Sequence, residues 1–253
     1  MPFTALSTMF FDLSTANILL VLAIFVWTGF VRTGLGFGGA ALGLPLLLLI
    51  HNQPIDWLPI IGAHLLFFSA LTLRTRLNNV DWVYLKKSAL LIIPSALVGV
   101  LGLLNLPNDW LVIFIYSVTL FYAITWVMNW AVLSNSKVLD KFLLIIGGYV
   151  AGISLTGAPL MYAVFMRNVA ATQLRNTLFV LWFVLVAIKM STFAAVGVNL
   201  HLWTALAFLP VVAVGHYLGL KAHDKILEND LHFKRVIGGA LIVISVLGLW
   251  SAR

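Results

Sequence analysis

The sequence contains no cysteine and very little charge, and each absence excludes a class of protein. Without thiols the chain can form neither a disulfide nor a thiolate metal site. Charged residues make up 9% of the 253 residues, whereas soluble domains carry about 25%. A water-facing surface cannot be built from so few charges. We therefore do not expect a soluble enzyme, and we predict no metal and no cofactor.

Apolar residues make up 62% of the chain and occur in long runs separated by short polar loops. Because about 20 apolar residues cross a bilayer as a helix, we predict a single all-α membrane domain over residues 1–253. The second and seventh of its ten apolar segments are too short to cross, and each follows a break rich in Gly, Ser or Thr, which predicts broken or re-entrant helices. The segments are 16–35, 37–50, 56–75, 82–104, 109–133, 140–154, 157–168, 173–197, 201–222 and 233–250.

The net charge of +7 is scattered over loops and forms no basic stripe, so nucleic acid is not an expected partner. Cytoplasmic loops of membrane proteins are rich in Lys and Arg. Most basic residues share one side if segments 1–2 form a hairpin entering from outside, segments 6–7 form one entering from inside, and the other six cross fully. This arrangement predicts a multi-pass protein of the cell inner membrane with both termini outside. Arg32, Lys189 and Arg253 fall outside the pattern, and Lys189 is expected to reach an interface.

Two parts of the sequence resemble each other. Residues 29–39, GFVRTGLGFGG, align without a gap with residues 148–158, GYVAGISLTGA, and IPSALVG at 93–99 aligns with LPVVAVG at 209–215. We therefore predict two repeats, at about 16–133 and 138–253. Because each repeat would contain three full crossings, an odd number, the second would be inverted in the membrane, which is an organisation that secondary transporters use.

The same Gly-rich stretches carry a resemblance to a known family. Residues 29–39 with Pro45, and residues 148–159 followed by QLRNTL at 173–178, resemble the sulfite exporter TauE/SafE family of membrane transporters. The resemblance covers nearly the whole chain. It implies export or uptake of sulfite, of sulfonates such as sulfoacetate, or of other small organic anions. The sequence departs from the family pattern in the first break, where Arg32 and Thr33 replace small apolar residues.

Each break exposes backbone groups that lipid cannot satisfy, so two facing breaks predict a cavity. The helices that restart there would point their positive ends at it, which favours an anion. Arg32 lies in the first break, where its guanidinium could hold an oxyanion in a fork; alternatively it extends to water. The predicted substrate-binding residues are Arg32, Thr33, Gly34, Gly36, Gly38, Gly39, Ser154, Thr156, Gly157 and Pro159.

All eight carboxylates fall in loops or at segment ends, so none is placed to bind a cation within the membrane. His64 and His216 lie within segments and are candidates for a coupling proton, because imidazole titrates near neutral pH; the alternative is an ordinary buried histidine. The hydroxyls of Thr33, Ser154 and Thr156 either donate to the anion or bond to helix carbonyls.

The sequence thus predicts a carrier that works by alternating access, with a small anion and the lipid bilayer as partners, and it favours no particular oligomeric state. Two alternatives stay open. One is a passive anion channel, and the other is an intramembrane hydrolase that would use Ser154 with His201 or His216.

Overall fold

The structure, a computed structural model, describes residues 11–35, 39–74, 77–130, 133–228 and 230–252. These residues form ten α-helices and one short 3-10 helix, without a strand, so the all-α class predicted from the sequence is confirmed. In chain order the helices are α2 (Thr15–Leu35), α3 (Gly39–Ile50), α4 (Pro54–Leu73), η1 (Leu77–Asn79), α5 (Trp82–Asn105), α6 (Asn108–Val127), α7 (Lys137–Ser154), α8 (Ala158–Asn168), α9 (Ala171–Ala195), α10 (Leu202–Glu228) and α11 (Asp230–Ser251).

Seven of the helices in the described residues are long and apolar enough to cross a membrane, which makes the chain a multi-pass membrane protein. α3 has 12 residues and α8 has 11. At about 1.5 Å per residue, each covers only about half of a hydrocarbon core some 30 Å thick. Six of the seven long helices are the predicted full crossings. The seventh is α2, so the first hairpin pairs one full-length helix with one half-length helix.

The break between α7 and α8 follows from its local sequence. α7 ends at Ser154, and Leu155 then adopts a left-handed backbone with φ 60°, while its N–H donates to the carbonyl of Ala151. α8 begins after Gly157, with Pro159 in its first turn. Proline suits that position because it has no N–H that would be left without a partner.

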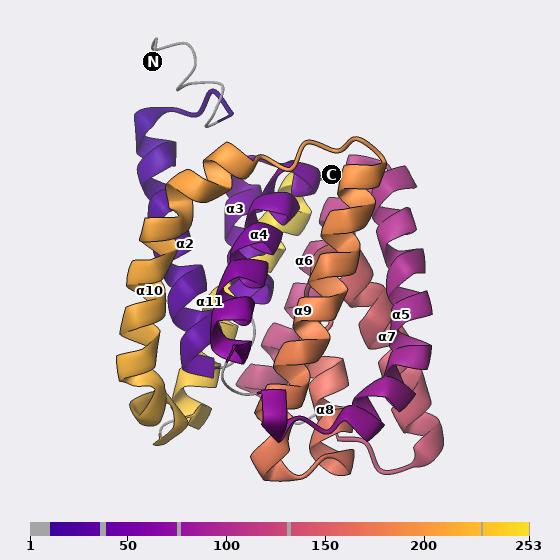
Figure 1. Cartoon of the computed structure of the whole chain (residues 1–253). Helices are drawn as coiled ribbons and strands as arrows, with labels where there is room; N and C mark the ends of the chain where they lie inside the picture. Colours follow the sequence, from indigo (N-terminus) through magenta and orange to yellow (C-terminus); the bar gives the residue numbers. More distant parts are fainter. Residues whose placement is uncertain (1–10, 36–38, 75–76, 131–132, 229, 253) are drawn as a thin grey trace.

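The helices pair mainly across the two halves of the chain. α2 packs along α10, α5 along α7, α6 along α11, and α4 against α9. In Figure 1 the α2–α10 pair forms one edge of the bundle and the α5–α7 pair forms the opposite edge. The two halves are therefore interleaved, and neither forms a separate bundle.

Glycines allow the closest of these contacts. A Cβ atom on Gly215 of α10 would lie 1.9 Å from the carbonyl oxygen of Val26 in α2, and one on Gly99 of α5 would lie 2.2 Å from the carbonyl oxygen of Tyr149 in α7. Gly99 and Gly215 are also matched in the self-alignment of the sequence. Each half thus uses the same glycine to approach the broken helix of the other half, in the small-residue packing typical of membrane helices.

The two ends of the bundle differ in charge. α2 begins and α11 ends at the same end of the bundle, whereas α5 and α7 begin at the other. Exposed basic side chains gather at the start of α5 and α7, namely Lys86, Lys87, Lys137 and Lys141. At the opposite end, Asp56 accepts from His51 over 2.7 Å and lies 3.4 Å from the imidazole of His201.

Gly215→Ala should destabilise the protein, because the added methyl group would overlap a backbone carbonyl unless α10 moved away from α2. We expect a loss of about 1–3 kcal/mol, measured as a lower melting temperature of the purified protein in detergent. Gly239→Ala in α11 is the matched control, since its Cβ would meet nothing within 4 Å. That variant should be neutral or slightly stabilised. Equal melting temperatures for Gly215→Ala and the wild type would contradict the close packing.

Candidate functional site

A cavity of about 50 Å³ lies between the two helix breaks. The cavity is small, so a small molecule is the kind of ligand that suits it. Its lining comes from the α2–α3 break, the α7–α8 break, α4 and α9. The residues are Arg32, Gly39, Ala40, Leu65, Ser69, Ala151, Leu155, Ala158, Phe179, Trp182, Leu185 and Val186.

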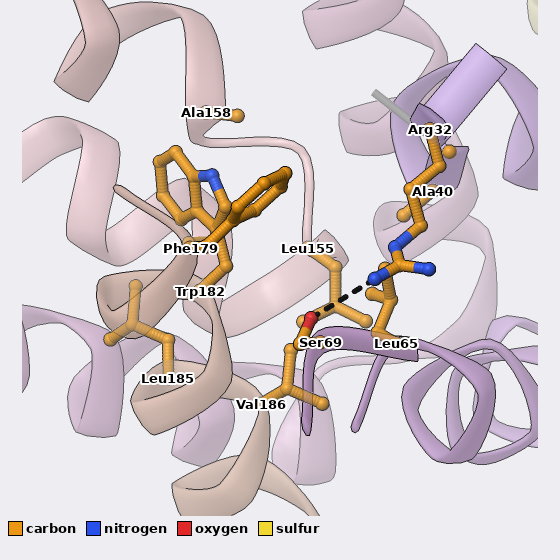
Figure 2. A pocket seen from close by; sticks show the side chains of 12 residues that line it. Arg32, Ala40, Leu65, Ser69, Leu155, Ala158, Phe179, Trp182, Leu185 and Val186 are labelled. Atoms are coloured by element: carbon orange, nitrogen blue, oxygen red, sulfur yellow. Dashed lines mark hydrogen bonds between the residues drawn. The ribbon is translucent and has the colours of Figure 1, made fainter. Parts of the chain in front are cut away.

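Arg32 supplies the positive charge of this cavity. Its side chain is 8% exposed, its Nη2 donates to Ser69 Oγ over 3.2 Å, and its guanidinium carbon lies 5.4 Å from the centre of the Phe68 ring. Figure 2 shows the guanidinium reaching toward Ser69. None of the ion pairs in the described part of the chain includes Arg32. The cation is therefore buried without a carboxylate, which leaves it able to bind an anion.

The wall across from Arg32 is apolar. Phe179 and Trp182 of α9 stand on that side, as Figure 2 shows, and Leu185 and Val186 continue the same helix face. The cavity thus has one polar side and one aromatic side. This arrangement suits a ligand with a charged head and a small apolar body.

The second break holds its two hydroxyl side chains away from the cavity lining. Ser154 and Thr156 are each 0% exposed, and their oxygens lie 2.6 Å apart. Because Ser154 Oγ donates to the carbonyl of Val150 over 3.0 Å, Thr156 donates to Ser154. These hydroxyls bond within the break, as in the alternative considered for them. Gly157 is also structural, since a Cβ there would lie 1.9 Å from the carbonyl oxygen of Gly147.

The other predicted Gly and Pro positions do not all line this cavity. Gly39 lines the cavity, whereas Gly34 is buried at the end of α2. Pro159 lines a separate cavity of about 10 Å³ on the side of α3 that faces α6 and α11. Gly36 and Gly38 lie outside the described residues.

Both candidate histidines join helices of different halves. Thr33 Oγ1 and His216 Nδ1 are 2.5 Å apart, which links α2 to α10. His64 Nε2 donates to the carbonyl of Ala205 over 2.7 Å, which links α4 to α10. His64 also lines a cavity of about 20 Å³ that Arg32 shares, and its Nδ1 is buried without a hydrogen-bond partner among the described residues.

The prediction for Lys189 is wrong, because this side chain does not reach an interface. It is 1% exposed, and its Nζ donates to the carbonyl of Ile153 over 3.0 Å. Sequence reasoning also missed Ser69, Phe179 and Trp182. The sequence could have marked Lys189 as a functional candidate, because it is a charged residue within an apolar span.

The hydroxyl and imidazole groups of the hydrolase alternative do not meet. Ser154 bonds to Val150 and Thr156, while His216 bonds to Thr33 and His201 lies beside Asp56. A serine nucleophile needs a base within hydrogen-bond reach, and the described residues provide none for Ser154.

Comparison with known proteins agrees with this architecture. A family model for the sulfite exporter TauE/SafE matches residues 20–247 of the chain, which include both breaks and all four parts of the cavity lining. The chain belongs to the sulfite exporter TauE/SafE family. The resemblance seen in the Gly-rich stretches is thereby confirmed, and membership makes this TauE/SafE chain a membrane transporter of small anions. No curated protein and no solved structure matches the chain.

Proposed function

We propose that this TauE/SafE chain is a carrier that binds a small organic anion in the cavity between its two helix breaks and moves it by alternating access. One observation carries the proposal. Two breaks that are far apart in the sequence line a single cavity together with Arg32, a buried cation without an ion-pair partner in the described part of the chain.

The chemistry of the lining supports an oxyanion as the ligand. Arg32 and Ser69 offer N–H and O–H donors on one side. α3 begins at Gly39 and α8 begins at Ala158, and both residues line the cavity. The first backbone N–H groups of each helix have no partner within the helix and are available as donors to an anion. With the aromatic wall opposite, sulfonates such as sulfoacetate, small carboxylates and sulfite are the candidate substrates.

The helix pairing supports two inverted repeats, at about 16–133 and 138–253. Exchanging the halves converts the α2–α10 contact into the α7–α5 contact, and it maps the α4–α9 and α6–α11 contacts onto themselves. Such a relation is expected of two inverted copies that surround a shared site. Alternating access would then expose the cavity to one side of the membrane at a time.

Arg32→Gln should reduce uptake of sulfoacetate into proteoliposomes by about 10-fold to 100-fold, because a charge-assisted hydrogen bond contributes about 1.5–3 kcal/mol. Lys87→Gln is the matched control, since it removes an exposed cation with the same change in net charge and should leave uptake unchanged. Normal uptake by Arg32→Gln would remove Arg32 from the binding site.

The same vesicles separate a carrier from the channel alternative. A carrier gives saturable flux, and unlabelled anion on one side accelerates entry of labelled anion from the other. Conductance that does not saturate would favour the channel.

We assign any coupling proton to His64 in preference to His216. His64 shares a small cavity with Arg32 and keeps one ring nitrogen without a partner among the described residues, whereas His216 is engaged by Thr33. A proton arriving at Nδ1 of His64 would place a second positive charge beside Arg32, so protonation and anion binding would favour each other.

His64→Gln should abolish sulfoacetate uptake driven by a pH gradient and preserve exchange of sulfoacetate at equal pH, because only the first process needs a proton. His232→Gln, at an exposed histidine, serves as the control and should retain both activities. Retention of gradient-driven uptake by His64→Gln would exclude His64 as the coupling group.

We propose further that the end of the bundle with the basic side chains faces the cytoplasm of a cell with this chain in its inner membrane. The absence of native cysteine makes this orientation easy to test. A membrane-impermeant maleimide should label Gln53→Cys in intact spheroplasts and label Asn135→Cys only after permeabilisation. Both positions are exposed, in loops at opposite ends. The reverse labelling pattern would overturn the proposed orientation.

A further inference from the structure

α9 carries a second buried basic side chain close to the cavity. Trp182, Leu185 and Val186 line the cavity from α9, and Lys189 follows three residues later on the same helix face. The Lys189 ammonium donates to the carbonyl of Ile153 over 3.0 Å and lies 5.9 Å from the centre of the Phe193 ring. In the described part of the chain, no ion pair includes Lys189.

The carbonyl that Lys189 binds belongs to the interrupted end of α7. The last carbonyls of a helix lack intrahelical partners and carry about half a negative charge. Here Ala151 O accepts from the N–H of Leu155, and Ile153 O accepts from Lys189. Ala151 and Leu155 both line the cavity, so this negative helix end lies at its edge.

The first break also contains the negative carbonyl end of a helix. α2 ends there, and Arg32 lies in its last turn. Two negative helix ends, from α2 and α7, and two positive ones, from α3 and α8, therefore meet around one cavity. Their partial charges roughly cancel, so the sign of the field inside depends on the side-chain charges.

We propose that Lys189 neutralises the carbonyl end of α7 and that Lys189 and Arg32 together give the cavity its preference for anions. This proposal rests on the proposed anion carrier. The affinity of the cavity then rises as the ligand carries more negative charge. Arg32 contacts the ligand directly, from within the cavity lining. Lys189 is a specificity-determining residue that acts through the α7 terminus. The ligand class that this arrangement favours is a small dianion with two acidic groups, above a monoanion of similar size.

The test compares two probes, methanesulfonate with one negative charge and sulfoacetate with two, binding to the purified full chain by calorimetry. Lys189→Gln keeps a hydrogen-bond donor for Ile153 and removes the charge, whereas Lys189→Arg keeps both. We expect Lys189→Gln to weaken sulfoacetate binding by about 30-fold and methanesulfonate binding by about 5-fold. Lys189→Arg should restore most of the affinity. Thermal melting of each variant reports its folding.

A purely structural role would not produce a loss that grows with the charge of the ligand. Unchanged affinity in folded Lys189→Gln, or an equal loss for both probes, would overturn the role of Lys189 and leave the anion carrier standing. Failure of the wild-type protein to bind either probe would overturn sulfonates as ligands of this cavity, and with them the preference proposed for Lys189. If Lys189→Gln does not fold, Lys189→Met gives the same comparison, because apolar replacements of buried charges are often well tolerated.

Discussion

A helix that stops inside a membrane leaves backbone groups that lipid cannot bond, and the rest of this structure depends on how that constraint is met. At the second break, individual hydrogen bonds satisfy several of these groups. The N–H of Leu155 returns to Ala151, Ser154 bonds to Val150 and Thr156, and Lys189 crosses from α9 to Ile153. These bonds keep the break buried, and they leave the start of α8 open toward the cavity.

Packing between the halves keeps the two breaks facing each other. Each broken hairpin begins with a helix that packs along a helix of the other half, α2 along α10 and α7 along α5. At the glycines of both contacts, the backbones are too close for a Cβ atom. α4 and α9 lie against each other and supply the remaining cavity lining. Under alternating access, the two glycine-packed pairs would move as units, so the breaks could separate or approach without any helix pair coming apart.

The sequence contained enough information for the helices, because polar loops, glycine and proline mark their ends. It also drew attention to Arg32, which lines the cavity, since a charge in an apolar stretch stands out. It could not place Ser69, Phe179 or Trp182 at the cavity. Helices that are apolar on every side give no periodic pattern that distinguishes the cavity face from the lipid face. The mutual bond of Ser154 and Thr156 was equally inaccessible, because it depends on the left-handed turn at Leu155 between them.

The distribution of buried charge carries the argument for an anion one step further. Asp140 is a buried carboxylate in the described residues, and it lies in the first turn of α7 with Arg167 and Asn168 as partners. Arg32 and Lys189 are buried at the opposite, interrupted ends of α2 and α7 and have no carboxylate beside them. A negative charge near a helix start and a positive charge near a helix end both complement the helix dipole. The difference lies in the partners: among the described residues, the protein supplies a basic partner for the buried acid and no acidic partner for Arg32 or Lys189.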